Sequence, residues 1–166
     1  MTSHTNDLSV LAHEGNADCK GDMILTARFA EFYPENSVWN DNPITDDMIR
    51  MAIESGVAEE VAPFGNENVV SEQKKIVDRP DEWHIARIIY FINHPEEIKD
   101  IWIDNECYHS RYPGMSCILP KPIITDGHHR YRAAAYLGLE KSHCEYSGRT
   151  DLLEYLRGDV DECPVE

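Results

Sequence analysis

The sequence has little positive charge and no long apolar segment. It contains 15 Lys and Arg residues against 31 Asp and Glu residues, a formal net charge of −16. Non-specific binding to nucleic acid or to an anionic membrane needs a basic surface, so this charge argues against both partners. No apolar run approaches the ~20 residues that cross a bilayer, and residues 1–22 lack the basic start and apolar stretch of a signal peptide. We therefore expect a soluble, cytoplasmic protein with no membrane partner.

Cysteines are few and are not spaced as metal ligands. There are five, an odd number, and none forms a CxxC pair. Reduced thiols in a cytosol are the simplest interpretation of this pattern. The cysteines are Cys19, Cys107, Cys117, Cys144 and Cys163.

The length of 166 residues suits one compact domain with an accessory segment. Helices are predicted where apolar residues repeat at helical spacing between capping signals, over 45–55, 81–93, 127–137 and 151–157. Thr45 is expected to cap the first of them, and Thr150 or Ser147 the last. Glycines follow three of them, at positions 56, 138 and 158. Short apolar runs predict strands at 69–77, 101–104, 122–125 and 143–146, and 23–32 is expected to be a strand, with a short helix as the alternative. Residues 105–121 are expected to be a loop. From residue 69 onward strands and helices alternate, which favours an α/β or α+β arrangement.

The segment IITDGHHRYRAAA, residues 123–135, carries the clearest chemical signal. It runs from an apolar strand through one glycine into a helix, and the N-terminus of a helix favours anions. Gly127 lets the backbone approach a phosphate closely, and the His-His-Arg sequence that follows adds donors at the same place. The residues thus predict a phosphate or nucleotide site. The alternative is that Asp126 only caps the helix and that Arg130 and Arg132 are ordinary solvated charges.

This segment resembles the signature of the ParB/sulfiredoxin-like superfamily. The segments IKDIWIDN (98–105) and CEYSGRTDLLEYLRG (144–158) flank it in the family's order. The resemblance implies an α+β fold, a small mixed sheet flanked by helices, over residues 68–158. Residues 1–67 would then be an N-terminal extension and residues 159–166 an acidic tail.

Departures from the family pattern discriminate among its functions. His128 stands where sulfiredoxin has its reactive cysteine, so sulfinic-acid reduction by that route is not expected. The turn also differs from that of partition proteins. The turn sequence Asp-Gly-His-His-Arg is most similar to that of the branch that contains free-serine kinases. The resemblance therefore implies an ATP- or ADP-dependent phosphotransferase or ATPase that acts on a small molecule with Mg²⁺. The alternatives are a ParB-like DNA-associated nuclease or regulator of a mobile element, and a non-catalytic nucleotide-binding module.

The resemblance also implies roles for single residues. Gly127, His128, His129 and Arg130 would contact phosphate. Catalytic roles would fall to His128 and to Asp126, which would assist metal binding or proton transfer. The general base is not marked by a motif, and Glu72 and Glu67 are candidates for it.

Weaker candidates for nucleotide binding lie on two other predicted helices. They are His84 and Arg87, for which the alternatives are a rim histidine and a solvated surface charge, and Thr150, for which the alternative is a plain N-cap. His109 and Arg111, in the long loop, could form a lid. Trp83 and Trp102 are expected to be core or interface anchors.

Overall fold

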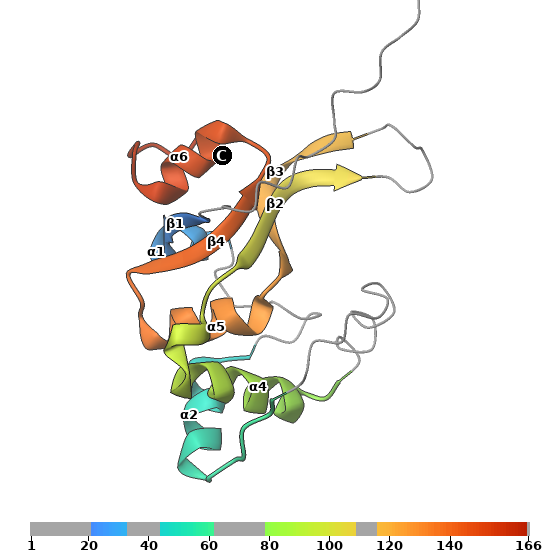
Figure 1. Cartoon of the computed structure of the whole chain (residues 1–166), viewed down its shortest axis with the longest axis vertical. Helices are drawn as coiled ribbons and strands as arrows, with labels where there is room; N and C mark the ends of the chain where they lie inside the picture. The colour runs from blue at the N-terminus through green and yellow to red at the C-terminus, as the bar shows by residue number, and fades with distance from the viewer. Residues whose placement is uncertain (1–20, 33–43, 62–78, 109–115, 166) are drawn as a thin grey trace, which may run out of the picture.

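A computed structural model describes residues 21–32, 44–61, 79–108 and 116–165 of the chain. Its sheet has four strands, β1 (Asp22–Leu25), β2 (Ile101–Tyr108), β3 (Ser116–Asp126) and β4 (Lys141–Ser147), in the order β1-β4-β2-β3 (Figure 1). β4 runs parallel to β2, whereas β1–β4 and β2–β3 are antiparallel pairs. The fold is therefore α+β with a mixed sheet, as expected.

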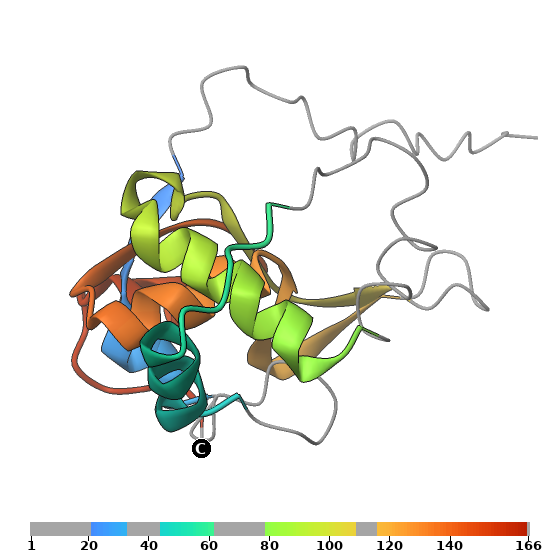
Figure 2. The same cartoon turned by 90° about the horizontal axis from the view of Figure 1, so that it is seen from below.

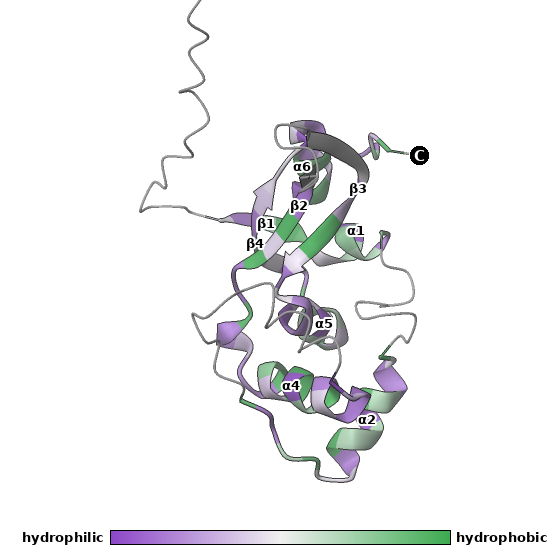
Figure 3. Ribbon diagram, turned by 90° about the vertical axis from the view of Figure 1, so that its right-hand side faces the viewer, coloured by the Kyte–Doolittle hydropathy of each residue, from purple (hydrophilic) through white to green (hydrophobic). Residues whose placement is uncertain are grey.

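The helices lie on one face of this sheet, and three of them form successive layers. The described helices are α1 (Thr26–Ala30), α2 (Asp46–Glu54), α4 (Asp81–Asn93), α5 (His128–Leu137) and α6 (Thr150–Arg157), with a short 3-10 turn at Pro95–Glu97. α5 lies below the sheet, α4 packs on α5, and α2 packs on α4 (Figures 1 and 3). Seen from below, α4 crosses the molecule with α2 beside it (Figure 2). No helix in the described part of the chain is long and apolar enough to cross a bilayer.

The side-chain pattern of the strands explains why the helices lie on one face. Ile101 and Ile103 of β2 are buried, and Ile124 of β3 and Cys144 of β4 are buried with them. The intervening Trp102 is 55% exposed. Because successive side chains of a strand point to opposite faces, one face of the sheet forms the core and the other does not.

Two expectations about secondary structure were wrong. Residues 23–32 are neither one strand nor one helix, because β1 ends at Leu25 and α1 begins at Thr26. The change of direction lets Phe29 reach the core, where its ring meets that of Tyr131 edge to face at 4.9 Å. The expected loop over 105–121 is largely strand, and only 109–115 fall outside the described residues. Pro120 was one reason to expect a loop, but it lies in β3, the last strand in the sheet order, where proline is tolerated.

The predicted helices are confirmed, with differences at their caps. The Thr45 side chain caps α2, accepting a hydrogen bond from the Met48 N–H at 3.2 Å. Neither Ser147 nor Thr150 caps α6, because the N-cap position is Arg149 and the Asp151 carboxylate accepts from the Leu152 N–H at 2.9 Å. The predicted strand 69–77 lies outside the described residues.

Residues from both sides of the expected 67/68 boundary share one hydrophobic core. Ile24, Phe29, Ile44 and Ile49 belong to it together with residues of α4, α5 and α6. The boundary itself lies outside the described residues. Near the other end of the chain, Arg28 donates a hydrogen bond to the carboxylate of Asp161 at 3.3 Å, in the segment expected to be an acidic tail.

A buried arginine links α5 to the start of α2. Arg132 is fully buried, and so is not the solvated charge that was considered as an alternative. Its Nε donates to the Ile44 carbonyl at 2.9 Å and its Nη2 contacts the Asp46 carboxylate. Since burying a charge without compensation is costly, these contacts stabilise the position of α2 on the core.

We predict that Asp46→Ala lowers the free energy of unfolding by about 1.5–3 kcal/mol, the value of a hydrogen bond to a charged group. Asp47→Ala is the matched control. It also removes a carboxylate from the first turn of α2, but Asp47 forms an ion pair with the exposed Arg50, at 2.9 Å, and with no other described residue. Its loss should cost under about 1 kcal/mol. Urea denaturation of both variants measures the difference, and equal stability would show that the Arg132 contact contributes nothing.

Candidate functional site

The turn between β3 and α5 is built on a glycine in close contact with β2. Gly127 has φ 90° and ψ 20°, in the left-handed region. A Cβ at this position would lie 3.1 Å from the Ile101 Cα. Position 127 therefore needs glycine for two reasons, its dihedral angles and the approach of its backbone to the neighbouring strand.

Arg130 fastens this turn to the segment before β2. Its Nη1 donates to the carbonyls of Lys99 at 2.6 Å and of Asp100 at 3.0 Å. Its Nη2 donates to the Asp126 carboxylate at 3.0 Å. Asp100 has a φ of 55°, which is uncommon for a residue with a side chain. The guanidinium thus holds an unusual backbone conformation in place beside the turn.

α4 brings a second histidine to the first turn of α5. The Nδ1 of His84 lies 3.0 Å from the Nε2 of His129, within hydrogen-bond distance. The two rings are stacked, with centroids 5.2 Å apart and planes inclined by 20°. The indole of Trp83 meets both rings edge-on, at 5.3 Å and 5.6 Å. The histidines therefore form a fixed pair covered by an aromatic ring.

Arg87 follows His84 by one turn of α4 and lies on the same side of the helix. Its guanidinium donates to the Glu60 carbonyl at 3.2 Å and sits over the rings of Phe91 and Tyr90, at 4.8 Å and 5.2 Å from their centroids. His84, Arg87 and His129 are only 1%, 4% and 9% exposed. The alternatives considered for these residues, a rim histidine at position 84 and a solvated surface charge at position 87, are therefore wrong.

Burial controls the charge of the three imidazoles. Burial lowers the pKa of His128 from 6.5 to about 4, against the opposing effect of Asp126. Burial also lowers the pKa of His84, and it lowers that of His129 further, with added contributions from His84 and Arg87. The imidazoles are consequently neutral near pH 7.

The structure brings together seven of the nine residues that the sequence suggested for the site. They are His84, Arg87, Asp126, Gly127, His128, His129 and Arg130. Thr150 lies apart from these seven. The β3–α5 turn contacts β2 through Gly127, which is beside Ile101, whereas the turn before α6 contacts β2 through Gly148, which is beside Asn105. Four residues of β2, about 13 Å, separate the two contacts. Glu72, and the weaker candidates Glu67, His109 and Arg111, lie outside the described residues.

Sequence reasoning missed two parts of this arrangement. The first is the backbone carbonyls of Lys99 and Asp100, which carry no side-chain signal. The second is the contact of Trp83 with the histidine pair. The position of Trp83 directly before His84, at the start of a helix, was the available signal.

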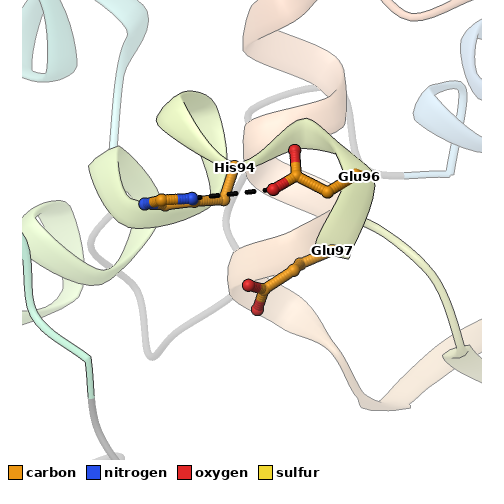
Figure 4. Close-up of side chains that lie close together, drawn as sticks. All are labelled: His94, Glu96 and Glu97. Atoms are coloured by element: carbon orange, nitrogen blue, oxygen red, sulfur yellow. Dashed lines mark ion pairs between the residues drawn. The ribbon is translucent and has the colours of Figure 1, made fainter.

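A different group of possible metal ligands lies at the other end of α4. The ligand atoms of His94, Glu96 and Glu97 all lie within 4.8 Å of one another (Figure 4). His94 Nδ1 is 3.7 Å from Glu96, and its Nε2 is 3.4 Å from Glu59. Asp126, the predicted metal ligand, belongs to no such group within the described residues.

Comparison of the chain with protein-family models, with curated proteins and with solved structures finds no match.

We predict that Gly127→Ala destabilises the fold more than Gly138→Ala does. Both glycines have positive φ, 90° and 64°, and so both substitutions impose the ~1–2 kcal/mol strain of a left-handed side chain. Only at position 127 does the new Cβ also meet backbone, since nothing lies within 4 Å of a Cβ at 138. Thermal unfolding of the two variants measures the difference, and an equal loss would contradict the close approach of Gly127 to β2.

We also predict that stability falls as the pH is lowered from 6.5. The folded pKa of His128, about 4, lies below its ordinary value of 6.5, so the unfolded chain binds more protons across this interval. The contribution to stability is complete above pH 6.5 and is lost as the pH falls toward 4. His128→Gln should reduce this slope by up to about 1.4 kcal/mol per pH unit. Urea denaturation across this interval measures the slope, and an unchanged slope in the variant would contradict the lowered pKa of His128.

Proposed function

We propose that the β3–α5 turn binds the phosphate groups of a nucleotide, ATP or ADP. One observation carries the proposal: α4 delivers a buried histidine and a buried arginine, His84 and Arg87, to the first turn of α5, beside His129. Cationic and N–H donor groups of this kind gather where an anion is bound, and they are costly to bury for packing alone.

Each group of the cluster has a distinct task in this proposal. The N-terminal end of α5 supplies a partial positive charge and backbone N–H groups at the phosphate. A neutral imidazole has one N–H, so His128 and the accepting member of the His84–His129 pair can each donate one to the phosphate, whereas the donating member uses its N–H on its partner. Arg87 supplies a full charge within electrostatic range of His129. Because the site is largely shielded from water, these interactions are stronger than they would be on the surface. Arg130 holds the turn through the carbonyls before β2 and helps as a positioning residue.

The reaction proposed is phosphoryl transfer to a small molecule, or ATP hydrolysis, by analogy with the superfamily that the turn resembles. Such chemistry depends mainly on positioning and on neutralising the charge of the phosphates. Mg²⁺ in these sites is held by one or two carboxylates and the phosphates themselves. Asp126 fits that role, because half of its side chain is exposed beside the turn. Glu72 stays the candidate for the base that accepts the hydroxyl proton.

We predict that ADP and ATP raise the unfolding temperature of the protein. A ligand at a hundredfold excess over its Kd stabilises the folded state by about 2.7 kcal/mol, which for a chain of this size is a shift of roughly 5–10 °C. His128→Ala should reduce the shift, since His128 is half-buried at the turn. Thermal denaturation with ATP, ADP and CTP, each with and without Mg²⁺, measures the effect, and release of phosphate from ATP separates an enzyme from a binding module.

His94→Ala is the matched control for this experiment. His94 also lies on the α4 segment, but about 15 Å further along it, ten residues after His84. It should retain the full shift. If no nucleotide shifts the unfolding temperature, or if His128→Ala and His94→Ala respond alike, the proposed site is wrong.

A further inference from the structure

We propose that this site takes up its anion together with a proton, and that the His84–His129 pair is the group that receives the proton. The inference rests on the proposed function and adds to it a coupling between ligand binding and pH. It identifies the ligand class as a tetrahedral dianion, the charge of a terminal phosphate.

The contact between the two imidazoles sets the number of protons that the pair can hold. The His84 Nδ1 and the His129 Nε2 are 3.0 Å apart, so one of these nitrogens donates and the other accepts. A neutral imidazole has one N–H and one acceptor nitrogen, which satisfies this contact with both rings uncharged. A further proton makes the pair cationic without breaking the contact.

The groups around the pair oppose that further proton while no anion is present. Arg87 from α4 acts on His129 with a positive charge, and Arg130 from α5 does the same. His128 is the third imidazole of the cluster. Two carboxylates act in the opposite sense, Asp81 on His84 and Asp126 on His128, and burial outweighs both. The Asp46 carboxylate of α2 is bound to Arg132.

A dianion at the first turn of α5 reverses this balance. It places negative charge beside the cluster and offsets the repulsion between the guanidinium groups and a protonated imidazole. Binding of the anion and binding of the proton then favour each other, and this coupling is reciprocal. Affinity for the dianion should consequently rise as the pH falls, by up to about tenfold for each pH unit while one proton is taken up.

Sulfate is the appropriate probe because its own charge stays constant over the range tested, whereas phosphate titrates there. We would measure sulfate binding to the full chain by calorimetry between about pH 5.5 and 7.5, where histidine is the side chain that titrates. Each titration is repeated in two buffers of different ionisation enthalpy, because the difference in heat counts the protons taken up. We expect tighter binding at low pH and uptake approaching one proton.

Two variants assign the uptake to the pair. His129→Gln places an amide near the position of Nε2 and so keeps a hydrogen-bonding group facing His84, but it cannot take a proton. We expect it to bind sulfate with little pH dependence and little proton uptake. His94→Gln removes a histidine that faces Glu59 and Glu96 instead, and it should keep the uptake of the wild type.

NMR signals of the histidine rings can also show which residue takes up the proton, and this measurement needs no variant. In the wild type at about pH 6.5, the chemical shifts of the ring nitrogens of His84 or His129 should change to those of an imidazolium when sulfate is added. This measurement keeps the inference testable if His129→Gln fails to fold.

The outcomes separate the inference from the proposed function. Sulfate binding with the same affinity at all pH values overturns the inference and leaves phosphate binding standing, and so does proton uptake that persists in His129→Gln while the ring signals of His84 stay unchanged. Uptake that persists together with a change in the His84 signals supports the inference and assigns the proton to His84. Failure of both sulfate and ADP to bind overturns the two together. Tight binding at low pH with ring signals of His84 or His129 that change on addition of sulfate supports both.

Discussion

The close approach of the β3–α5 turn to the start of β2 determines the position of most other parts of the core. Gly127 lies against the backbone of Ile101, and Arg130 is hydrogen-bonded to the carbonyls of Lys99 and Asp100. Together these contacts fix where α5 begins and the direction in which it leaves the sheet. Ala133 and Ala134 are fully buried, so the helix packs through small side chains. α4 can then lie on α5, and its first turns reach the N-terminus of α5.

The packing of α4 on α5 buries polar side chains at positions where apolar side chains would be less costly to bury. His84, Arg87 and His129 lie between α4 and α5 and are almost inaccessible to water. Burial penalises the protonated form of both histidines and also lowers the pKa of Arg87. Isosteric apolar side chains would avoid that penalty, and strongly perturbed titratable groups gather at functional sites more often than elsewhere. The contrast with Arg132 is informative, because that arginine is also buried but is neutralised by Asp46 and serves the packing of α2.

The sequence predicted those features that depend on local signals. The helix after Gly127 and the helix with Thr45 at its cap were found because caps and apolar spacing act over a few residues. The strand character of 105–108 and 116–121 was missed, because it comes from pairing between β2 and β3 and not from composition. The pairing of β1 with β4 was missed for the same reason, since its partners are more than a hundred residues apart.

The site shows the same division between local and distant information. The motif from Asp126 to Arg130 was visible as a contiguous segment, and so was the possibility that His84 and Arg87 act with it. The hydrogen bond between His84 and His129 could not be predicted, since it joins two helices 45 residues apart at a distance set by their packing. The hydrogen-bond partners of Arg130 could not be predicted from the sequence either. Its position in the motif suggests a phosphate contact, whereas its donors are directed at carbonyls of the neighbouring segment.

The net charge of −16 places a constraint on any anion that reaches this cluster. An acidic surface repels an approaching dianion over roughly the Debye length, about 8 Å at physiological ionic strength. The attraction of the cluster acts at shorter range but in a medium with little water, so it is weakened far less by salt. Recognition at such a site therefore depends on contacts made after entry and not on long-range steering. Under the proposed function, a nucleotide that carries Mg²⁺ would meet less repulsion than a bare one, because the ion offsets part of its negative charge.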